Sequence, residues 1–144
     1  MKKIVILGAG TGGTIMANKL RKALDTSEWE ITIVDKDKTH YYQPGFLFIP
    51  FGIYGKHDVI KPKADFIPSG VKMLFKGIDK IEPGENKVIL EGGQILNYDY
   101  LIVATGTKIE PEETPGMKDG LWRKDVFDFY TLSGALALRE RIRD

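Results

Sequence analysis

The 144-residue chain carries 21 Lys and Arg against 20 Asp and Glu, so its formal net charge of +1 offers no basic field to attract nucleic acid. It contains no cysteine, which excludes disulfides, thiolate metal ligands and a catalytic thiol within these residues. No apolar stretch approaches the ~20 residues of a membrane-spanning helix, so we expect one cytoplasmic domain that binds a small molecule.

The first 35 residues predict a βαβ unit. The apolar run at 3–7 is typical of a buried strand, and residues 12–24 have apolar positions at helical spacing. The β-branched run at 30–35 predicts a second strand, which ends at Asp35. A strand, a glycine-rich turn, a helix and a strand in this order imply a parallel pair with a right-handed crossover.

The rest of the chain adds strands and one helix. The aromatic stretch 40–55 has no clear period, so we expect an ordered loop with one short helix. Residues 87–90 and 94–96 flank Glu91-Gly92-Gly93, which indicates a hairpin. Residues 130–143 predict an amphipathic helix. The fold class is therefore α/β: a Rossmann-like parallel sheet from strands near 3–7, 30–35, 71–75 and 99–104, with an antiparallel β excursion near 77–96.

The turn after the first strand contains a phosphate-binding pattern. Gly8, Gly10 and Gly13 match G-x-G-x-x-G between a strand and a helix, where glycines allow a tight turn, a close approach to a pyrophosphate and tight helix packing. Asp35 ends the second strand, where a carboxylate would reach a ribose hydroxyl. Because an acid repels a 2′-phosphate, the pattern favours FAD or NAD over NADP.

Further motifs resemble one family. The segment Tyr98-Asp99-Tyr100-Leu101-Ile102-Val103-Ala104-Thr105-Gly106, together with the early glycines, resembles flavoproteins with two dinucleotide-binding domains, the FAD-dependent pyridine nucleotide-disulfide oxidoreductases. The opening turn LGAGTGG, the loop YYQPG at 41–45 and Phe129-Tyr130-Thr131 are similar to sulfide:quinone oxidoreductases and the flavoprotein subunits of flavocytochrome c sulfide dehydrogenases. The resemblance implies that residues 1–144 are the N-terminal part of an FAD/NAD(P)-binding domain, with the second dinucleotide-binding domain and the C-terminal domain missing.

The resemblance also implies FAD as cofactor and a role for each matching position. The pyrophosphate would lie against Gly8, Gly10, Gly12 and Gly13. Asp35 would hold the adenosine ribose, Lys36 would flank the adenosine, and the Ile78 backbone would face the adenine. Gln43 and Pro44 would approach the isoalloxazine, and Thr105 and Gly106 would close over the cofactor. Lys36 as a solvated charge and Ile78 as a core residue are equally good interpretations.

The absent cysteines limit the functional prediction. Members of the family oxidise sulfide with cysteines near the flavin, and Tyr130 stands about where one of them lies in many members. We therefore predict no catalytic residue, and an inactive chain on its own. In the full-length protein, peripheral to the membrane, sulfide and a membrane quinone would be the partners.

Three alternatives stay open. A type II NADH:quinone oxidoreductase, or another NAD(P)H-linked flavin reductase, shares the glycine and Ala-Thr-Gly motifs. A non-catalytic nucleotide-binding module needs only the glycine motif.

His40 and His57 have no acidic cluster beside them, so no metal site is predicted. A truncated chain would expose part of the aromatic stretch, which would favour self-association.

Overall fold

The computed structural model describes residues 1–117 and 120–143. The chain forms two compact units, which we describe separately. Unit 1 comprises residues 1–40 and 62–106, and unit 2 comprises residues 41–61 and 107–144. Within the described ranges, no helix has both the length and the apolar character needed to cross a membrane.

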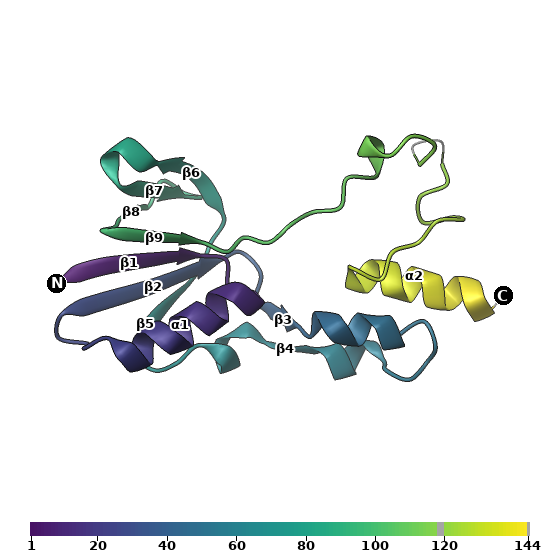
Figure 1. Cartoon of the computed structure of the whole chain (residues 1–144), viewed down its shortest axis with the longest axis horizontal. Coiled ribbons are helices and arrows are strands. Elements are labelled where there is room, and N and C mark those ends of the chain that lie inside the picture. Colours follow the sequence, from purple (N-terminus) through teal and green to yellow (C-terminus); the bar gives the residue numbers. More distant parts are fainter. Residues whose placement is uncertain (118–119, 144) are drawn as a thin grey trace. The chain divides into compact units, whose positions relative to one another are not determined.

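Unit 1 is built on a four-stranded parallel sheet. Its strands are β1 (Lys2–Leu7), β2 (Trp29–Asp35), β5 (Val71–Phe75) and β9 (Tyr100–Val103), in the order β5-β2-β1-β9. Each neighbouring pair is parallel, and helix α1 (Thr11–Ala23) connects β1 to β2 and lies against one face of the sheet (Figure 1). The predicted α/β class and the four predicted strands of the parallel sheet are confirmed.

The central strand β1 is buried on both faces. Ile4 and Ile6 point toward the α1 side, where they pack with Ala17 of the helix. Val5 and Leu7 point to the opposite face, since successive side chains of a strand alternate. A strand that is covered twice in this way must be apolar throughout, which explains the unbroken run at the start of the sequence.

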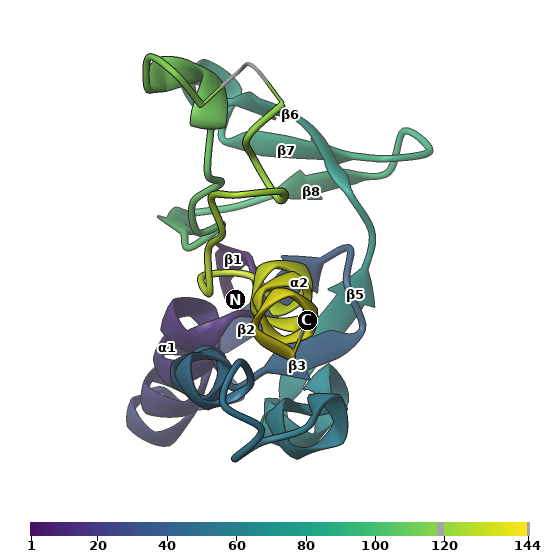
Figure 2. The same cartoon turned by 90° about the vertical axis from the view of Figure 1, so that its right-hand side faces the viewer.

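The second face is covered by an antiparallel sheet. Its strands are β6 (Ile78–Glu82), β7 (Lys87–Leu90) and β8 (Ile95–Asn97), which run side by side as a separate layer (Figure 2). The buried side chains of Val88 and Leu90 join Val5 and Leu7 in one core. The hairpin turn holds Gly92 and Gly93 at φ +84° and +79°, which favours glycine at both positions. The expected β excursion is therefore confirmed.

The chain passes between the units through β3 (Thr39–Tyr41) and β4 (Ile60–Pro62), which pair with each other. Unit 2 then packs helix α2 (Leu132–Arg143) on two short 3₁₀ helices, η1 (Gln43–Phe48) and η2 (Lys56–Val59). Its core contains Phe46, Ile49, Val59 and Ala135. Three further 3₁₀ turns are η3 (Lys63–Phe66), η4 (Pro83–Glu85) and η5 (Pro111–Glu113).

Helix α2 begins two residues later than the sequence pattern predicts. The Asp128 carboxylate accepts hydrogen bonds from the N–H groups of Tyr130 and Thr131, at 3.0 and 2.8 Å. The Thr131 hydroxyl in turn accepts one from the N–H of Gly134 at 3.0 Å. These polar side chains satisfy backbone groups at the helix start, so the helical hydrogen-bond pattern begins only at Leu132.

Candidate functional site

Three neighbouring strands of unit 1 end at one edge of the sheet. Gly8 follows β1, Asp35 ends β2, and Thr105 lies two residues after β9. The chain leaves β1 toward β2 on one side, whereas β9 joins β1 on the other, so this edge is a topological switch point. In open α/β sheets, ligands bind outside the carboxyl ends of the strands at such a point.

A hollow of about 450 Å³ lies at this edge. Five residues predicted to contact the cofactor line it, although they come from distant parts of the sequence. The lining residues are Gly8, Val34, Asp35, Lys36, Lys76, Gly77, Ile78, Ile81, Glu91, Val103 and Thr105.

Two glycines of the turn are required by the packing of the chain itself. Gly8 has φ +93°, and a Cβ there would lie 2.3 Å from the Ala104 carbonyl oxygen. A Cβ on Gly13 would lie 1.8 Å from the Gly8 carbonyl oxygen. Both contacts are far shorter than atoms tolerate, so these glycines let α1 and the segment directly after β9 approach the end of β1.

No contact within the chain requires a glycine at position 10. Its backbone is extended, at φ −76° and ψ −161°, which any residue can adopt, and a Cβ there would meet nothing within 4 Å. Gly12 is nearly as open, with only the Ala104 Cβ at 3.7 Å. The open space beside Gly10 fits a ligand that lies directly against the backbone.

The N-terminus of α1 is left without a side-chain cap. Gly10 is the N-cap residue and provides no hydrogen bond, and the first turn of α1 contains no acidic residue. The Thr14 hydroxyl instead donates back to the carbonyl oxygens of Gly10 and Thr11, at 2.8 and 3.1 Å. The first-turn N–H groups and the positive end of the helix dipole thus suit an anion such as a pyrophosphate.

Asp35 is held by three hydrogen bonds from the chain. Its Oδ2 accepts from the Ala9 N–H at 2.8 Å and pairs with Lys63 Nζ at 2.7 Å, and its Oδ1 accepts from the Asp37 N–H at 2.9 Å. Burial alone would raise the pKa of Asp35, but the bonds from Lys63, Asp37 and Ala9 together lower it below the ordinary value. Asp35 is therefore an ionised acceptor at neutral pH.

Lys63 contacts the Asp35 carboxylate, although no sequence pattern indicates it. Its side chain is 6% exposed, and it lies far from Asp35 in the sequence, in the 3₁₀ turn after β4. Nearby, the His40 ring stacks on Phe66 with 4.0 Å between centroids. Burial, and then the charge of Lys63, lowers the pKa of His40. Lys76 and Glu91 also line the hollow without a local sequence pattern that points to them.

Three other residues predicted to contact the cofactor, Gly106, Gln43 and Pro44, do not line this hollow. Gly106, with φ +76°, follows Thr105 but does not line the hollow. Gln43 and Pro44 belong to unit 2, where they line a different hollow of about 430 Å³ with Leu47, Phe129 and Tyr130. The glycine turn, Asp35, Lys36, Ile78, Thr105 and Gly106 thus belong to unit 1, and Gln43 and Pro44 belong to unit 2.

Tyr130 is anchored within unit 2. Its hydroxyl lies 2.6 Å from the Thr107 Oγ1, and its carbonyl oxygen accepts a hydrogen bond from Gln43 Nε2 at 2.9 Å. The hydrogen bond between the Tyr130 and Thr107 hydroxyls, and then the nearby Gln43 side chain, lower the pKa of the Tyr130 hydroxyl. The position predicted to match a family cysteine therefore carries an ordered aromatic side chain.

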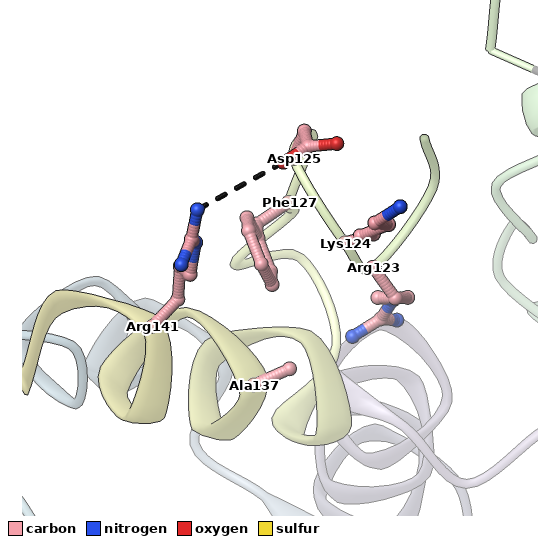
Figure 3. A pocket seen from close by; sticks show the side chains of 6 residues that line it. All are labelled: Arg123, Lys124, Asp125, Phe127, Ala137 and Arg141. Carbon is pink, nitrogen blue, oxygen red and sulfur yellow. Dashed lines mark ion pairs between the residues drawn. The ribbon is translucent and has the colours of Figure 1, made fainter. Parts of the chain in front are cut away.

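A third hollow, of about 360 Å³, lies in unit 2 between α2 and residues 123–127, and three of its six lining residues are basic (Figure 3). Figure 3 shows Phe127 between Arg141 and Arg123, with Arg141 directed toward Asp125 at 3.9 Å. Arg123 pairs with Asp128 at 2.8 Å and donates to the Thr131 hydroxyl at 2.9 Å. Arg123 is thus part of the network that starts α2, and no residue predicted for the cofactor lines this hollow.

No metal-binding cluster is found in residues 1–117 and 120–143, since they contain no group of three or more His, Asp or Glu side chains placed to hold an ion.

Unit 1 has the features of an α/β dinucleotide-binding fold. These are a glycine turn, a helix N-terminus without a side-chain cap and an acid at the end of β2.

The chain belongs to the pyridine nucleotide-disulphide oxidoreductase family, whose model matches residues 2–141. The predicted resemblance is thereby confirmed at the level of the family.

Individual relatives divide between two activities. The mitochondrial sulfide:quinone oxidoreductase of Dictyostelium discoideum is 34% identical over 129 residues, which cover 90% of this chain and 28% of the relative. A type II NADH:quinone oxidoreductase of Staphylococcus haemolyticus is 35% identical over 119 residues, covering 82% of this chain and 29% of the relative. The chain thus spans less than a third of the length of these relatives.

A solved structure supports the fold. The sulfide:quinone oxidoreductase of Aquifex aeolicus matches with a TM-score of 0.77 and 23% identity, over 99% of this chain and 32% of that chain. Its similarity shows that the whole fold of this chain occurs within a larger oxidoreductase.

Proposed function

We propose that the chain is the N-terminal FAD-binding part of a sulfide:quinone oxidoreductase-like flavoprotein. One observation carries the proposal: Gly8, Asp35, Lys36, Ile78 and Thr105 line a single hollow at the carboxyl edge of the parallel sheet. The open N-terminus of α1 belongs to the same unit. The adenosine diphosphate half of FAD requires this combination of an anion site and a hydroxyl acceptor.

Each residue has a physical role in this proposal. The first-turn N–H groups of α1 bind the pyrophosphate, and the missing side chain of Gly10 lets it approach the backbone. The Oδ1 of Asp35 accepts a hydrogen bond from a ribose hydroxyl. Ile78 and Ile81 give the hollow an apolar wall for the adenine. When bound, FAD supplies an acceptor for two electrons.

The sulfide reaction belongs to the proposed larger protein. This chain has no cysteine to attack or carry sulfur, so the thiols would have to come from residues other than these 144. Sulfide as electron donor and a membrane quinone as acceptor are proposed from the 34% identity to the Dictyostelium enzyme. Peripheral attachment to a membrane is proposed on the same basis.

The 35% identity to a type II NADH:quinone oxidoreductase supports a second candidate. In that case NADH would be the donor and quinone the acceptor. The two candidates differ in what the coding sequence after Asp144 should hold: two cysteine codons for sulfide oxidation, or a second G-x-G-x-x-G turn for a nicotinamide substrate. Finding neither would leave a nucleotide-binding module as the better proposal.

Titration of the purified chain with FAD, ADP and 2′-phospho-ADP tests the cofactor proposal. Calorimetry is expected to give 1:1 binding of FAD and competition by ADP. Binding of 2′-phospho-ADP is expected to be weaker because Asp35 is an ionised acceptor beside the ribose. A chain that binds neither FAD nor ADP would refute the proposed function.

A further inference from the structure

We infer that Lys63 is a positioning residue that limits Asp35 to a single ribose hydroxyl and decides which hydroxyl it binds. This inference rests on the proposed function and deepens it, because it concerns how the same site recognises its ligand. It starts from the number of hydrogen bonds that the Asp35 carboxylate accepts from the chain.

An ionised carboxylate has about four acceptor positions, two on each oxygen. In Asp35, the Oδ2 receives both the Ala9 N–H at 2.8 Å and Lys63 Nζ at 2.7 Å. The Oδ1 receives the Asp37 N–H at 2.9 Å. Only one acceptor position remains, and it is on Oδ1. A carboxylate that grips both hydroxyls of a ribose needs a free position on each oxygen, which Asp35 does not have.

Lys63 is the contact that fills Oδ2. The Ala9 and Asp37 bonds come from backbone groups of the β1 and β2 ends and are fixed by the fold, whereas the third bond depends on one side chain. The Lys63 backbone is itself anchored, since its N–H donates to the Lys38 carbonyl oxygen at 2.8 Å. With its side chain 6% exposed against 16% for Asp35, the pair has little freedom to rotate or to exchange with water.

The charge of Lys63 has a second effect. It holds Asp35 ionised despite burial, so the remaining Oδ1 position stays a pure acceptor at neutral pH. The other titratable groups nearby are Lys36, Lys76 and Glu91, which line the hollow, and His40, which lies close enough to Lys63 for its pKa to be lowered. Without Lys63, a partly buried Asp35 would take up a proton at a higher pH.

The first test uses the unmodified chain and three ligands: ADP, 2′-deoxy-ADP and 3′-deoxy-ADP. If Asp35 binds one hydroxyl, one of the two deoxy analogues loses about tenfold or more in affinity and the other loses less than about threefold. Equal losses for the two analogues would overturn the inference and leave the proposed function intact. Failure of ADP itself to bind would refute the proposed function.

The second test removes the positioning contact. In Lys63→Met, Oδ2 has a free acceptor position, so the difference between the two deoxy analogues is expected to shrink to less than about threefold. Protonation of the ADP phosphate weakens binding to both proteins as the pH is lowered from 8 to 5, but the ADP affinity of the variant is expected to fall more steeply than that of the wild type because Asp35 is no longer held ionised. A preserved preference and parallel pH profiles for the two proteins would show that Lys63 does not position Asp35.

A matched control and a fallback variant complete the design. Lys61→Met removes an exposed lysine two positions away and is expected to keep the wild-type preference. If Lys63→Met does not fold, Asp35→Asn/Lys63→Met removes both charges of the buried pair and is expected to lose the preference as well. A double variant that keeps the full preference between the analogues would overturn the inference.

Discussion

Alanine at position 10, compared with alanine at position 13, distinguishes a glycine that a ligand requires from a glycine that the fold requires. A Cβ on Gly10 would meet nothing within 4 Å, and its backbone angles are ordinary for any residue. Gly→Ala at such a position stabilises by about 0.4–1 kcal/mol through the unfolded chain. Alanine is a poorer N-cap than glycine by roughly 0.5–1 kcal/mol, so the two effects nearly cancel.

Gly13→Ala is the matched comparison. Its Cβ would lie 1.8 Å from the carbonyl oxygen and 2.9 Å from the carbonyl carbon of Gly8, which are backbone atoms that cannot rotate away. Overpacking typically costs about 1–3 kcal/mol, and a clash with backbone atoms places Gly13→Ala at the upper end, about 3 kcal/mol. For a chain of this size, that corresponds to a melting temperature lower by roughly 10 °C.

Thermal unfolding by circular dichroism and calorimetric titration with ADP measure both effects. We expect Gly10→Ala to melt within about 2 °C of the wild type and to bind ADP at least tenfold more weakly, a loss of about 1.4 kcal/mol. We expect Gly13→Ala to melt much lower. The reasoning is refuted if Gly10→Ala binds ADP as the wild type does, or if it is as unstable as Gly13→Ala.

Three further predictions concern stability. Ile33 of β2 is fully buried in the core that the sheet shares with α1, so Ile33→Ala should destabilise the chain by about 2–5 kcal/mol, as measured by urea unfolding; a loss below about 1 kcal/mol would contradict the packing described. Asp128→Ala removes the ion pair with Arg123 and three hydrogen bonds at the start of α2, so it should destabilise unit 2 by about 1–3 kcal/mol, seen as lost helical signal before unit 1 unfolds. The lowered pKa of Asp35 means that the unfolded chain takes up a proton there first as the pH drops below about 4. The stability that the Asp35 carboxylate contributes is thus fully present above about pH 5 and is lost as the pH falls through its pKa in the folded chain. Asp35→Asn should lose less unfolding free energy than the wild type between pH 7 and pH 3, and equal losses in the two proteins would contradict this prediction.

Much of unit 1 could be predicted because its signals are local. The apolar run of β1, the glycine turn and the β-branched run of β2 are adjacent in sequence, and their spacing leaves few alternatives to a βαβ unit. Asp35 could be identified for the same reason, since it directly follows a strand. The hairpin near Gly92 follows from residues that tolerate positive φ.

The remaining features of the fold and the site depend on tertiary contacts, which the spacing of residues in the sequence does not predict. Lys63 meets Asp35 only because the chain leaves unit 1 after His40 and returns at Pro62. Sequence motifs also assigned Gln43 and Pro44 to the cofactor without indicating that they belong to a different unit. Helix α2 was placed slightly too early because apolar periodicity does not register the capping by Asp128.

The central claim is that unit 1 binds the adenosine diphosphate half of FAD in the hollow beside Gly8, Asp35 and Thr105. Amide NMR spectra of the chain, recorded during titration with ADP, test it most directly. The account predicts that the largest shifts fall on the N–H groups of residues 8–14 and on those around Asp35 and Thr105. Shifts centred on the basic hollow of Figure 3, or no shifts at saturating ADP, would contradict it.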